Sequence, residues 1–216
     1  MTAKTILITA GPTQEPIDPV RYISNRSTGM MGYEIAKAAK KAGFKVCLIS
    51  GPVFLPVPKV NKFIPVLTAD DMRKAIKKNI RGTDVIIMAA AVCDFRPEKV
   101  SGKKIKKKER WTLELVKNQD LIATTNKKGL IKIGFALETE RAKSEARKKM
   151  VDKRLDLIIA NEKNRSNDPF GAGKKEIMMI GKNGNVKKIS GNKNKLAGAI
   201  IKEAITIMNG TSDGKK

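Results

Sequence analysis

Histidine is absent from this sequence of 216 residues. Its absence excludes Ser-His-Asp and Cys-His catalysis, proton transfer by imidazole, and histidine-ligated zinc. Any chemistry that the chain performs must therefore use lysine, arginine, carboxylates, hydroxyls, backbone amides or a metal ion brought by a substrate. Cysteine is also scarce: Cys47 and Cys93 both lie in apolar runs, where a small buried thiol is the expected role. No disulfide framework is expected.

Long apolar runs are missing as well. No run of about 18 apolar residues occurs, and the N-terminal segment MTAKTILITA leads directly into a polar loop without a signal-peptide pattern. We therefore expect a cytoplasmic protein with no membrane contact. The chain is long enough for one α/β domain with a substantial core, which we place at residues 1–208, followed by a disordered tail at 209–216.

Acidic residues are outnumbered by basic ones, with 21 Asp and Glu against 45 Lys and Arg, which gives a formal net charge of +24. Such an excess favours anionic partners, including nucleic acids. Most of the cations, however, fall on polar faces of expected helices, and the few aromatic residues are not interleaved with basic ones for base stacking. Small, highly anionic substrates explain the charge at least as well, so a basic nucleic-acid-binding protein is kept as an alternative.

Apolar strands alternate with amphipathic helices along most of the chain. Strands are expected at TILITA, KVCLIS, FIPVL, DVIIMAA, IKIGFAL and LDLIIA, and one of the expected helices lies near QDLIATTNKK. This alternation predicts an α/β, Rossmann-like, doubly wound fold with a mostly parallel sheet. A C-terminal hairpin, KEIMMIGKNGNVKKIS, turns at Asn183-Gly184 and precedes a final helix. The lysine-rich residues 99–121 are expected to form a protruding β-hairpin flap.

In such a sheet, ligands gather at the carboxyl ends of the strands. The first loop there, AGPTQEPIDPVRYISNRSTGMMG, is unusually long, and its amides from Ser27 to Gly32 precede a helix, where they could hold a phosphate. A plain glycine-containing helix start is the alternative. Two other strand ends carry AAAVCDFRP and GFALET. Asp94 in the former suits a hydroxyl or a metal ion, although an Asp that caps a turn before Pro97 is equally ordinary.

A nicotinamide-binding Rossmann domain is a weaker alternative. Its fingerprint requires G-x-G-x-x-G directly after the first strand and an acidic residue at the end of the second. Here the second strand ends in VCLISGP, which contains neither Asp nor Glu. An NAD(P)-dependent oxidoreductase is therefore disfavoured.

Several motifs recur in the order found in the phosphopantothenoylcysteine synthetase family, the phosphopantothenate–cysteine ligases. They are AGPTQEPIDPVRYISNRSTGMMG, AAAVCDFRP, KKIKKK, VKNQDLI, GFALET and LDLIIAN, and the resemblance extends from about Thr5 to about Ile207. The family joins 4′-phosphopantothenate to L-cysteine in coenzyme A biosynthesis, through an acyl-nucleotide and with release of pyrophosphate. Because this chain begins at the first synthetase strand, it resembles the stand-alone bacterial type, for which the flavin-dependent phosphopantothenoylcysteine decarboxylase would be a separate partner.

The resemblance implies a substrate site next to a nucleotide site. Asn25 resembles the asparagine that contacts the carbonyl of the intermediate, Arg21 the arginine that reaches the substrate phosphate across a dimer interface, and Lys104 the flap lysine on the triphosphate. These three are implied as catalytic. The implied substrate-binding residues are Arg21, Asn25, Ala90, Ala91 and Asp94. The implied nucleotide-binding residues are Gly11, Ser27, Gly29, Gly32, Met88, Ala89, Ala90, Asp94, Lys104, Gln119, Asp120, Leu121, Ile122, Phe135, Lys149 and Lys153.

The same resemblance implies the co-substrate and the assembly. Lys149 and Lys153 lie four residues apart on one helix face and match a pair in the bacterial members, which favours CTP over the ATP of animal relatives. Mg²⁺ is implied as a companion of the triphosphate, with no metal site built by the protein, and a homodimer is implied. Three departures from the family pattern, Thr28, Gln119 and Leu137, leave every assigned charged or amide group in place and bear on the loop around Gln119.

Overall fold

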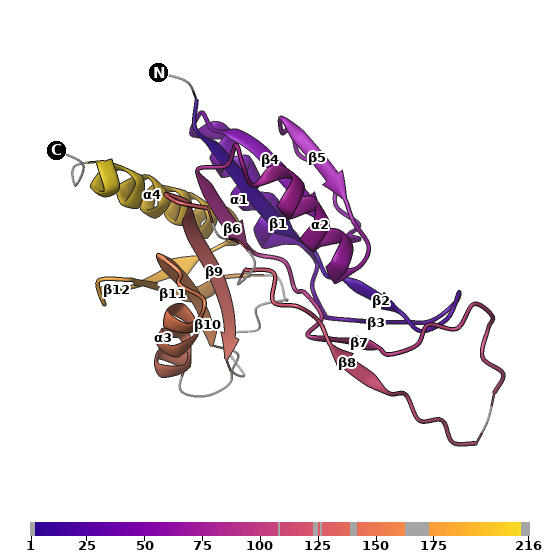
Figure 1. The fold of residues 1–216 in the computed structure, drawn as a ribbon. Helices are drawn as coiled ribbons and strands as arrows, with labels where there is room; N and C mark the ends of the chain where they lie inside the picture. Colours follow the sequence, from indigo (N-terminus) through magenta and orange to yellow (C-terminus); the bar gives the residue numbers. More distant parts are fainter. Residues whose placement is uncertain are drawn as a thin grey trace.

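A single large sheet organises the chain in the computed structural model, which describes residues 3–107, 109–122, 125, 127–138, 142–162 and 173–212. The sheet has eight strands in the order β12-β11-β10-β9-β6-β1-β4-β5 (Figure 1). Its strands are β1 (Thr5–Ala10), β4 (Lys45–Ser50), β5 (Lys62–Pro65), β6 (Val85–Met88), β9 (Ile131–Glu138), β10 (Leu157–Glu162), β11 (Lys175–Gly181) and β12 (Val186–Gly191). The helices are α1 (Met30–Lys41), α2 (Ala69–Asn79), α3 (Ala142–Asp152) and α4 (Lys193–Ser212).

The strand order identifies the fold. From β5 to β10 all neighbouring strands pair in parallel, and in chain order they are arranged 3-2-1-4-5-6, as in a Rossmann domain. The antiparallel strands β11 and β12 extend the sheet beyond β10. The expected doubly wound, mostly parallel sheet and the C-terminal hairpin are therefore confirmed, and the direction of winding reverses between β1 and β6.

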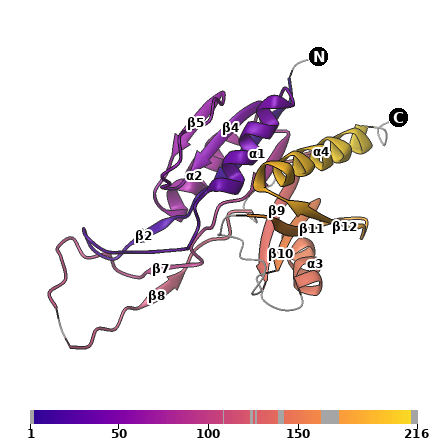
Figure 2. The ribbon, with the colours of Figure 1, turned by 180° about the vertical axis from the view of Figure 1, so that it is seen from behind.

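Helices cover both faces of the sheet (Figure 1, Figure 2). The side chains of Ile6 and Ile8 point into a core shared with α1 and α4. Leu7, between them in the strand, points to the opposite core, which α2 covers, and α3 packs further along that same face over β9 and β10. Because helices shield both faces of the sheet from water, the side chains on both sides of β1 are buried. The sequence of β1 is accordingly a nearly continuous apolar run.

The first turn of α2 is held by two carboxylates. Thr68 caps it, since its hydroxyl oxygen accepts from the Asp71 amide at 3.1 Å, while the Asp71 carboxylate accepts from the Thr68 amide at 3.0 Å. The buried carboxylate of Glu15 accepts from the Ala69 amide at 2.9 Å. Glu15 belongs to the long loop after β1, so this bond fixes that loop against α2.

Two small antiparallel ribbons project from the carboxyl edge of the sheet (Figure 1, Figure 2). One pairs β2 (Gln14–Pro16) with β3 (Tyr22–Ser24), and the other pairs β7 (Phe95–Pro97) with β8 (Leu115–Lys117). We call these two ribbons and their connecting loops the arm. Hydrogen bonds from the Ser101 amide to the Ile17 carbonyl, at 3.0 Å, and from the Ile105 amide to the Asp18 carboxylate, at 3.1 Å, join the two ribbons. Within the arm, the β7–β8 ribbon with its connecting loop corresponds to the flap expected at residues 99–121.

The helix expected near QDLIATTNKK is wrong for the residues that the structure describes. Gln119 and Asp120 are irregular, and Leu121 and Ile122 form a turn. The Asp120 carboxylate accepts from the Ile122 amide at 3.0 Å, a local bond that competes with a helix. Leu121 and Ile122 are also buried in two different core clusters, so the chain spreads rather than coils here.

At the C-terminus, α4 continues to Ser212, four residues past the expected domain end at 208. The rest of the expected tail, residues 213–216, lies outside the described residues. Cys47 and Cys93 are buried free thiols, as expected. In the described part of the chain, no helix combines the length and the apolar character needed to cross a membrane.

Two helical glycines test how closely α1 approaches the sheet. A Cβ on Gly32 would lie 2.5 Å from the Cβ of Ala10, whereas a Cβ on Gly198 in α4 would meet nothing within 4 Å. We expect Gly32→Ala to lower the free energy of unfolding by about 1–3 kcal/mol through overpacking, and Gly198→Ala to raise it by up to ~1 kcal/mol through helix propensity. Urea unfolding followed by circular dichroism measures both. Equal stability of the two variants would contradict the tight contact between α1 and β1.

Candidate functional site

A cleft of about 610 Å³ opens at the carboxyl edge of the sheet, on the face that carries α2 and α3. Its walls come from the loop after β6, the segment after β8, and β9 with α3. The residues predicted from the sequence that line it are Asn25, Met88, Ala90, Ala91, Asp94, Gln119, Asp120, Leu121, Ile122, Phe135, Lys149 and Lys153. The structure thus brings together residues from segments that are far apart in the chain.

Backbone contacts between strand ends position the first wall. The Ala91 amide donates to the Gly11 carbonyl at 2.9 Å, and the Ala91 carbonyl accepts from the Thr13 amide at 3.2 Å. The Thr13 hydroxyl oxygen accepts from the Cys93 amide at 2.9 Å. Residues 90–94 are therefore held against the loop that follows β1, which is where the winding of the sheet reverses and where such folds bind ligands.

Asn25 lines the cleft from the loop before α1. Its side-chain nitrogen donates to the carbonyls of Val92, at 3.0 Å, and Ala91, at 3.3 Å. The carboxamide therefore lies against the cleft wall, with its nitrogen directed at protein carbonyls in this structure. Its expected contact with the carbonyl of a bound intermediate stays a prediction.

The second wall carries the cations. The Lys153 ammonium lies 2.9 Å from the Asp120 carboxylate, and Lys149 lines the cleft one helical turn earlier. About two fifths of each side chain of the Lys153–Asp120 pair is exposed, so solvent screens the pair, and exposed pairs of this kind contribute only about 0–1 kcal/mol. A polyanion in the cleft can therefore compete with Asp120 for Lys153.

Asn118 joins the two walls, and its role was not predicted from the sequence. Its amide donates to the Asp94 carbonyl at 2.7 Å, and its side-chain nitrogen donates to the Cys93 carbonyl at 2.9 Å. The only sequence signal for Asn118 was its position in the motif VKNQDLI, directly after an expected alternating strand. Cys93, which also lines the cleft, has its thiol pKa raised by burial, so it stays protonated and is not a thiolate nucleophile.

The predicted glycines of the first loop lie outside the cleft lining. Gly11 and Gly29 have positive φ, and a Cβ on Gly29 would lie 2.6 Å from Val53, so these residues allow close packing of the loop. Gly32 allows the close contact between α1 and β1 described above. Ala89 is also absent from the lining, and its amide bonds the Thr9 carbonyl at 3.2 Å.

Ser27 lines a second cavity, of about 750 Å³, on the other side of Asn25. The Ser27 amide donates to the Asn25 carbonyl at 2.9 Å, and its hydroxyl oxygen accepts from the Gly29 amide at 3.3 Å. These bonds shape the turn before α1. A phosphate contact by the amides of this turn stays a prediction.

The remaining two predicted residues, Arg21 and Lys104, lie on the arm. The Arg21 guanidinium bonds the Asp18 carboxylate at 2.6 Å and the Ile105 carbonyl at 2.7 Å, and its carbon lies 5.1 Å from the centre of the Trp111 ring. Lys104 is exposed beside Ile105, in the long loop between β7 and β8. This loop extends away from the sheet (Figure 1). Neither residue lines the cleft, and their expected ligand contacts stay predictions.

Among the described residues, no group of three or more Cys, Asp and Glu side chains is placed to hold a metal ion. Within the described ranges, two carboxylates face the cleft. Asp120 is paired with Lys153, whereas Asp94 makes no ion pair with any residue that the structure describes. A divalent ion in this cleft would therefore need most of its oxygen ligands from a bound substrate.

The fold and the cleft together define a Rossmann-type domain whose cleft opens where the winding of the sheet reverses. Residues 1–208 match the family model described as the DNA/pantothenate metabolism flavoprotein C-terminal domain, and the chain belongs to this family. The match confirms the resemblance to phosphopantothenoylcysteine synthetase that the sequence motifs indicated.

Two curated relatives carry the name Coenzyme A biosynthesis bifunctional protein CoaBC. The protein of Bacillus subtilis (strain 168) is 44% identical over 193 residues, which cover 88% of this chain and 48% of the relative. That of Escherichia coli (strain K12) is 40% identical over 189 residues, which cover 83% of this chain and 46% of the relative. The chain thus spans about half the length of the curated relatives that it matches.

Solved structures agree with the fold. The crystal structure of the C-terminal domain of CoaBC superimposes with a TM-score of 0.83 at 35% identity and covers 97% of both chains. A Cab2 mutant in complex with phosphopantothenate-cysteine has a TM-score of 0.80 at 17% identity, covering 99% of this chain and 89% of that chain. The latter likeness concerns the fold alone.

Asp18 is the anchor of the arm, and this role can be tested with the single tryptophan. The Asp18 side chain is fully buried. Burial by itself would raise the pKa of this carboxyl, but hydrogen bonds from the Ile105 and Val20 amides and from Arg21 hold it well below its usual range. The stabilisation is therefore present above the unfolded pKa of about 3.9 and is lost only as the pH falls through the lower folded value.

We accordingly expect Asp18→Asn to change the emission of Trp111 at pH 7, because Arg21 loses its partner and no longer stays over the ring. The wild-type emission should hold as the pH falls from 7 through about 4. Fluorescence titration measures both, and Asp152→Asn, at an exposed site, is the control. An unchanged spectrum for Asp18→Asn would show that this carboxylate does not anchor the arm.

Proposed function

We propose that the protein is a phosphopantothenate–cysteine ligase of coenzyme A biosynthesis that uses CTP. The observation that carries the proposal is the cleft, where a wall with Asn25, Ala91 and Asp94 faces a wall with Lys149 and Lys153. Family membership supports the same reaction, as does the likeness to proteins named for coenzyme A biosynthesis. Together these residues match the two halves of a site in which an acid is activated by a nucleotide.

In the first half-reaction, a carboxylate oxygen of 4′-phosphopantothenate attacks the α-phosphorus of CTP. A new P–O bond forms, the bond from that phosphorus to the β-phosphate oxygen breaks, and pyrophosphate leaves with the electron pair. The substrate carboxylate, the α-phosphate and the leaving pyrophosphate, all of them anionic, meet in this step. The ammonium groups of Lys149 and Lys153 can offset this charge and position the phosphates, which does not require a histidine.

In the second half-reaction, the amine of L-cysteine attacks the carbonyl carbon of the acyl-cytidylate. The C–N bond forms, the C–O bond to the phosphate breaks, and CMP leaves with the electron pair while the nitrogen loses a proton to solvent. Asn25 is the residue that we assign to this carbonyl. To polarise it, the side-chain nitrogen would exchange its bond to the Ala91 carbonyl, the longer of its two at 3.3 Å, for the substrate oxygen.

Mg²⁺ would be held by triphosphate oxygens, with Asp94 as the cleft carboxylate that has no cation of its own among the described residues. When bound, the ion would screen the negative charge of the nucleotide. Gln119 to Ile122 would then lie along the nucleotide, with Phe135 beside the base.

The proposal includes a homodimer in the cytoplasm, with the decarboxylase as a possible separate partner. Arg21 and Lys104 lie on the arm and not in the cleft of the same chain, so a second copy is a simple means of bringing them to the phosphates. Sedimentation with and without CTP measures this assembly.

The nucleotide preference is tested by incubating the protein with 4′-phosphopantothenate, L-cysteine, Mg²⁺ and either CTP or ATP. We expect product and pyrophosphate with CTP and little of either with ATP, because the lysine pair of α3 matches the bacterial enzymes. Equal use of both nucleotides would contradict the CTP assignment. Salt-sensitive retention on DNA or RNA, without cysteine-dependent turnover, would favour the nucleic-acid alternative.

The assignment of Asn25 is tested with Asn25→Asp, which replaces the amide donor by a carboxylate. We expect pyrophosphate release to continue while the acyl-cytidylate accumulates, because the carbonyl loses its donor in the second step. Quenched-flow analysis of both species measures this, with Asn209→Asp at an exposed site of α4 as the control. If pyrophosphate release and product formation fall together, Asn25 does not act mainly on the second half-reaction.

A further inference from the structure

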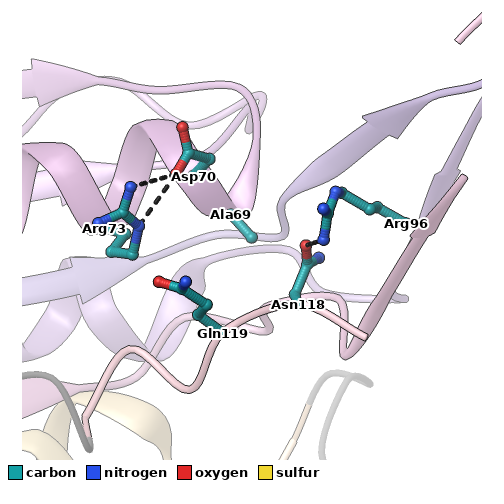
Figure 3. A pocket seen from close by; sticks show the side chains of 6 residues that line it. All are labelled: Ala69, Asp70, Arg73, Arg96, Asn118 and Gln119. Carbon is teal, nitrogen blue, oxygen red and sulfur yellow. Dashed lines mark hydrogen bonds and ion pairs between the residues drawn. The ribbon is translucent and has the colours of Figure 1, made fainter. Parts of the chain in front are cut away.

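A smaller pocket, distinct from the cleft and from the cavity that Ser27 lines, lies beside the cleft, between the first turn of α2, strand β7 and the segment after β8 (Figure 3). Its volume is about 290 Å³. The residues that line it are Ala69, Asp70, Arg73, Arg96, Asn118 and Gln119. None of the motif matches assigned a ligand to this pocket, and only Gln119 was expected to contact the nucleotide.

One wall of the pocket has its negative charge fully paired. The Asp70 carboxylate accepts from the Arg73 guanidinium at 2.6 and 2.9 Å (Figure 3). It also pairs with the Lys74 ammonium at 2.7 Å. The Lys74 and Arg73 hydrogen bonds hold the pKa of Asp70 below its ordinary value, so it stays ionised and occupied. Half of the Asp70 side chain is exposed, so solvent screens these pairs, but both carboxylate oxygens already have a cationic partner in this structure.

The opposite wall carries a cation without a carboxylate partner. One terminal nitrogen of Arg96 donates to two neutral oxygens, the Lys117 carbonyl at 3.1 Å and the Asn118 carboxamide oxygen at 3.2 Å. Among the residues that the structure describes, no ion pair neutralises this guanidinium. Its other donors stay available, which makes it the group in this pocket best suited to bind an anion.

The pocket adjoins the cleft. Asn118 and Gln119 line both. The Asn118 carboxamide is oriented from both ends, since its oxygen accepts from Arg96 and its nitrogen donates to the Cys93 carbonyl, next to Asp94. A small ligand held by Arg96 would therefore lie directly beside the groups that we assign to the reaction.

We propose that this pocket binds the α-carboxylate of the amino acid whose amine attacks the acyl-nucleotide, with Arg96 as the carboxylate-binding residue. The inference rests on the function proposed above and names the site of its second substrate. The volume is at the lower limit of the ~300–1,000 Å³ usual for pockets that enclose larger ligands, which suits an amino acid better than a nucleotide.

Charge complementarity favours the same occupant. A carboxylate accepts two parallel hydrogen bonds from a guanidinium, and this geometry fixes the direction of the rest of the ligand. With the carboxylate on Arg96, the amine can point past Asn118 and Gln119 into the cleft. The paired state of Asp70 also leaves that carboxylate less able to draw the amine away from the cleft.

The test compares L-cysteine with cysteamine, which is cysteine without the carboxylate. We expect the wild type to prefer cysteine, and Arg96→Gln to lower kcat/KM for cysteine by about 10- to 100-fold, the effect of losing a charged hydrogen bond, with little change for cysteamine. Arg96→Lys keeps the charge without the bidentate geometry and should restore part of the preference. Arg81→Gln, at an exposed site beyond α2, is the matched control.

The two half-reactions separate this inference from the proposed function. Pyrophosphate release from CTP and 4′-phosphopantothenate, measured without any amine, should be the same in Arg96→Gln and the wild type. If the wild type itself releases no pyrophosphate, the proposed function fails. If Arg96→Gln lowers the use of both amines equally, Arg96 acts only through Asn118, and the carboxylate assignment is overturned.

A binding measurement does not depend on turnover. In ¹⁵N-labelled protein, L-cysteine should shift the amide signals of Asp70 and Gln119 more than cysteamine does, and Arg96→Gln should remove the difference. Identical shifts with the two amines, or shifts produced by pyrophosphate and not by cysteine, would overturn the amino acid as the occupant.

Discussion

The close approach of three strand ends is the constraint on which the site depends. A Cβ on Gly51, after β4, would lie 1.8 Å from the Pro12 carbonyl oxygen, so only glycine allows this contact. On the other side, the Gly11 carbonyl accepts from the Ala91 amide. The loop after β1 is thereby held between the ends of β4 and β6. Because the winding reverses between β1 and β6, this contact also sets where the cleft opens and which loops form its walls.

The carboxylates that pair with the cations of the cleft and of the arm differ in how far they are buried. In the cleft, Lys153 is held by a partly exposed carboxylate that an incoming polyanion can displace. In the arm, Arg21 is held by the fully buried Asp18, which such an anion cannot easily displace because the buried carboxylate would lose its counter-charge. A phosphate brought to the arm would therefore bind Arg21 alongside Asp18 and not in its place. The large net charge of the chain therefore does not by itself indicate where an anionic ligand binds. The burial of each counter-ion decides which cations can exchange that counter-ion for a ligand.

Much of the fold could be predicted from the sequence because its signals are local. Alternating apolar strands and amphipathic helices indicated the doubly wound sheet, and the strand ends indicated the loops that line the cleft. The segment after β8 was predicted incorrectly. Its apolar residues have helical character, but the Asp120 carboxylate bonds the Ile122 amide, and neighbouring side chains enter separate cores. A local sequence pattern does not contain these tertiary contacts, which override helix propensity here.

The roles of Asn118 and Arg96 could not be predicted for a related reason. Each belongs to a three-residue ribbon strand or its end, and neither shows a periodicity that separates it from solvated surface. Their importance depends on the pairing of β7 with β8, which brings Arg96 beside the Lys117 carbonyl and Asn118 beside Cys93. Since these contacts join residues more than 20 positions apart, the wall between pocket and cleft exists only after the ribbon has formed. The same ribbon is one of the two that form the arm, so the geometry of this wall and of that part of the arm depends on one set of backbone hydrogen bonds.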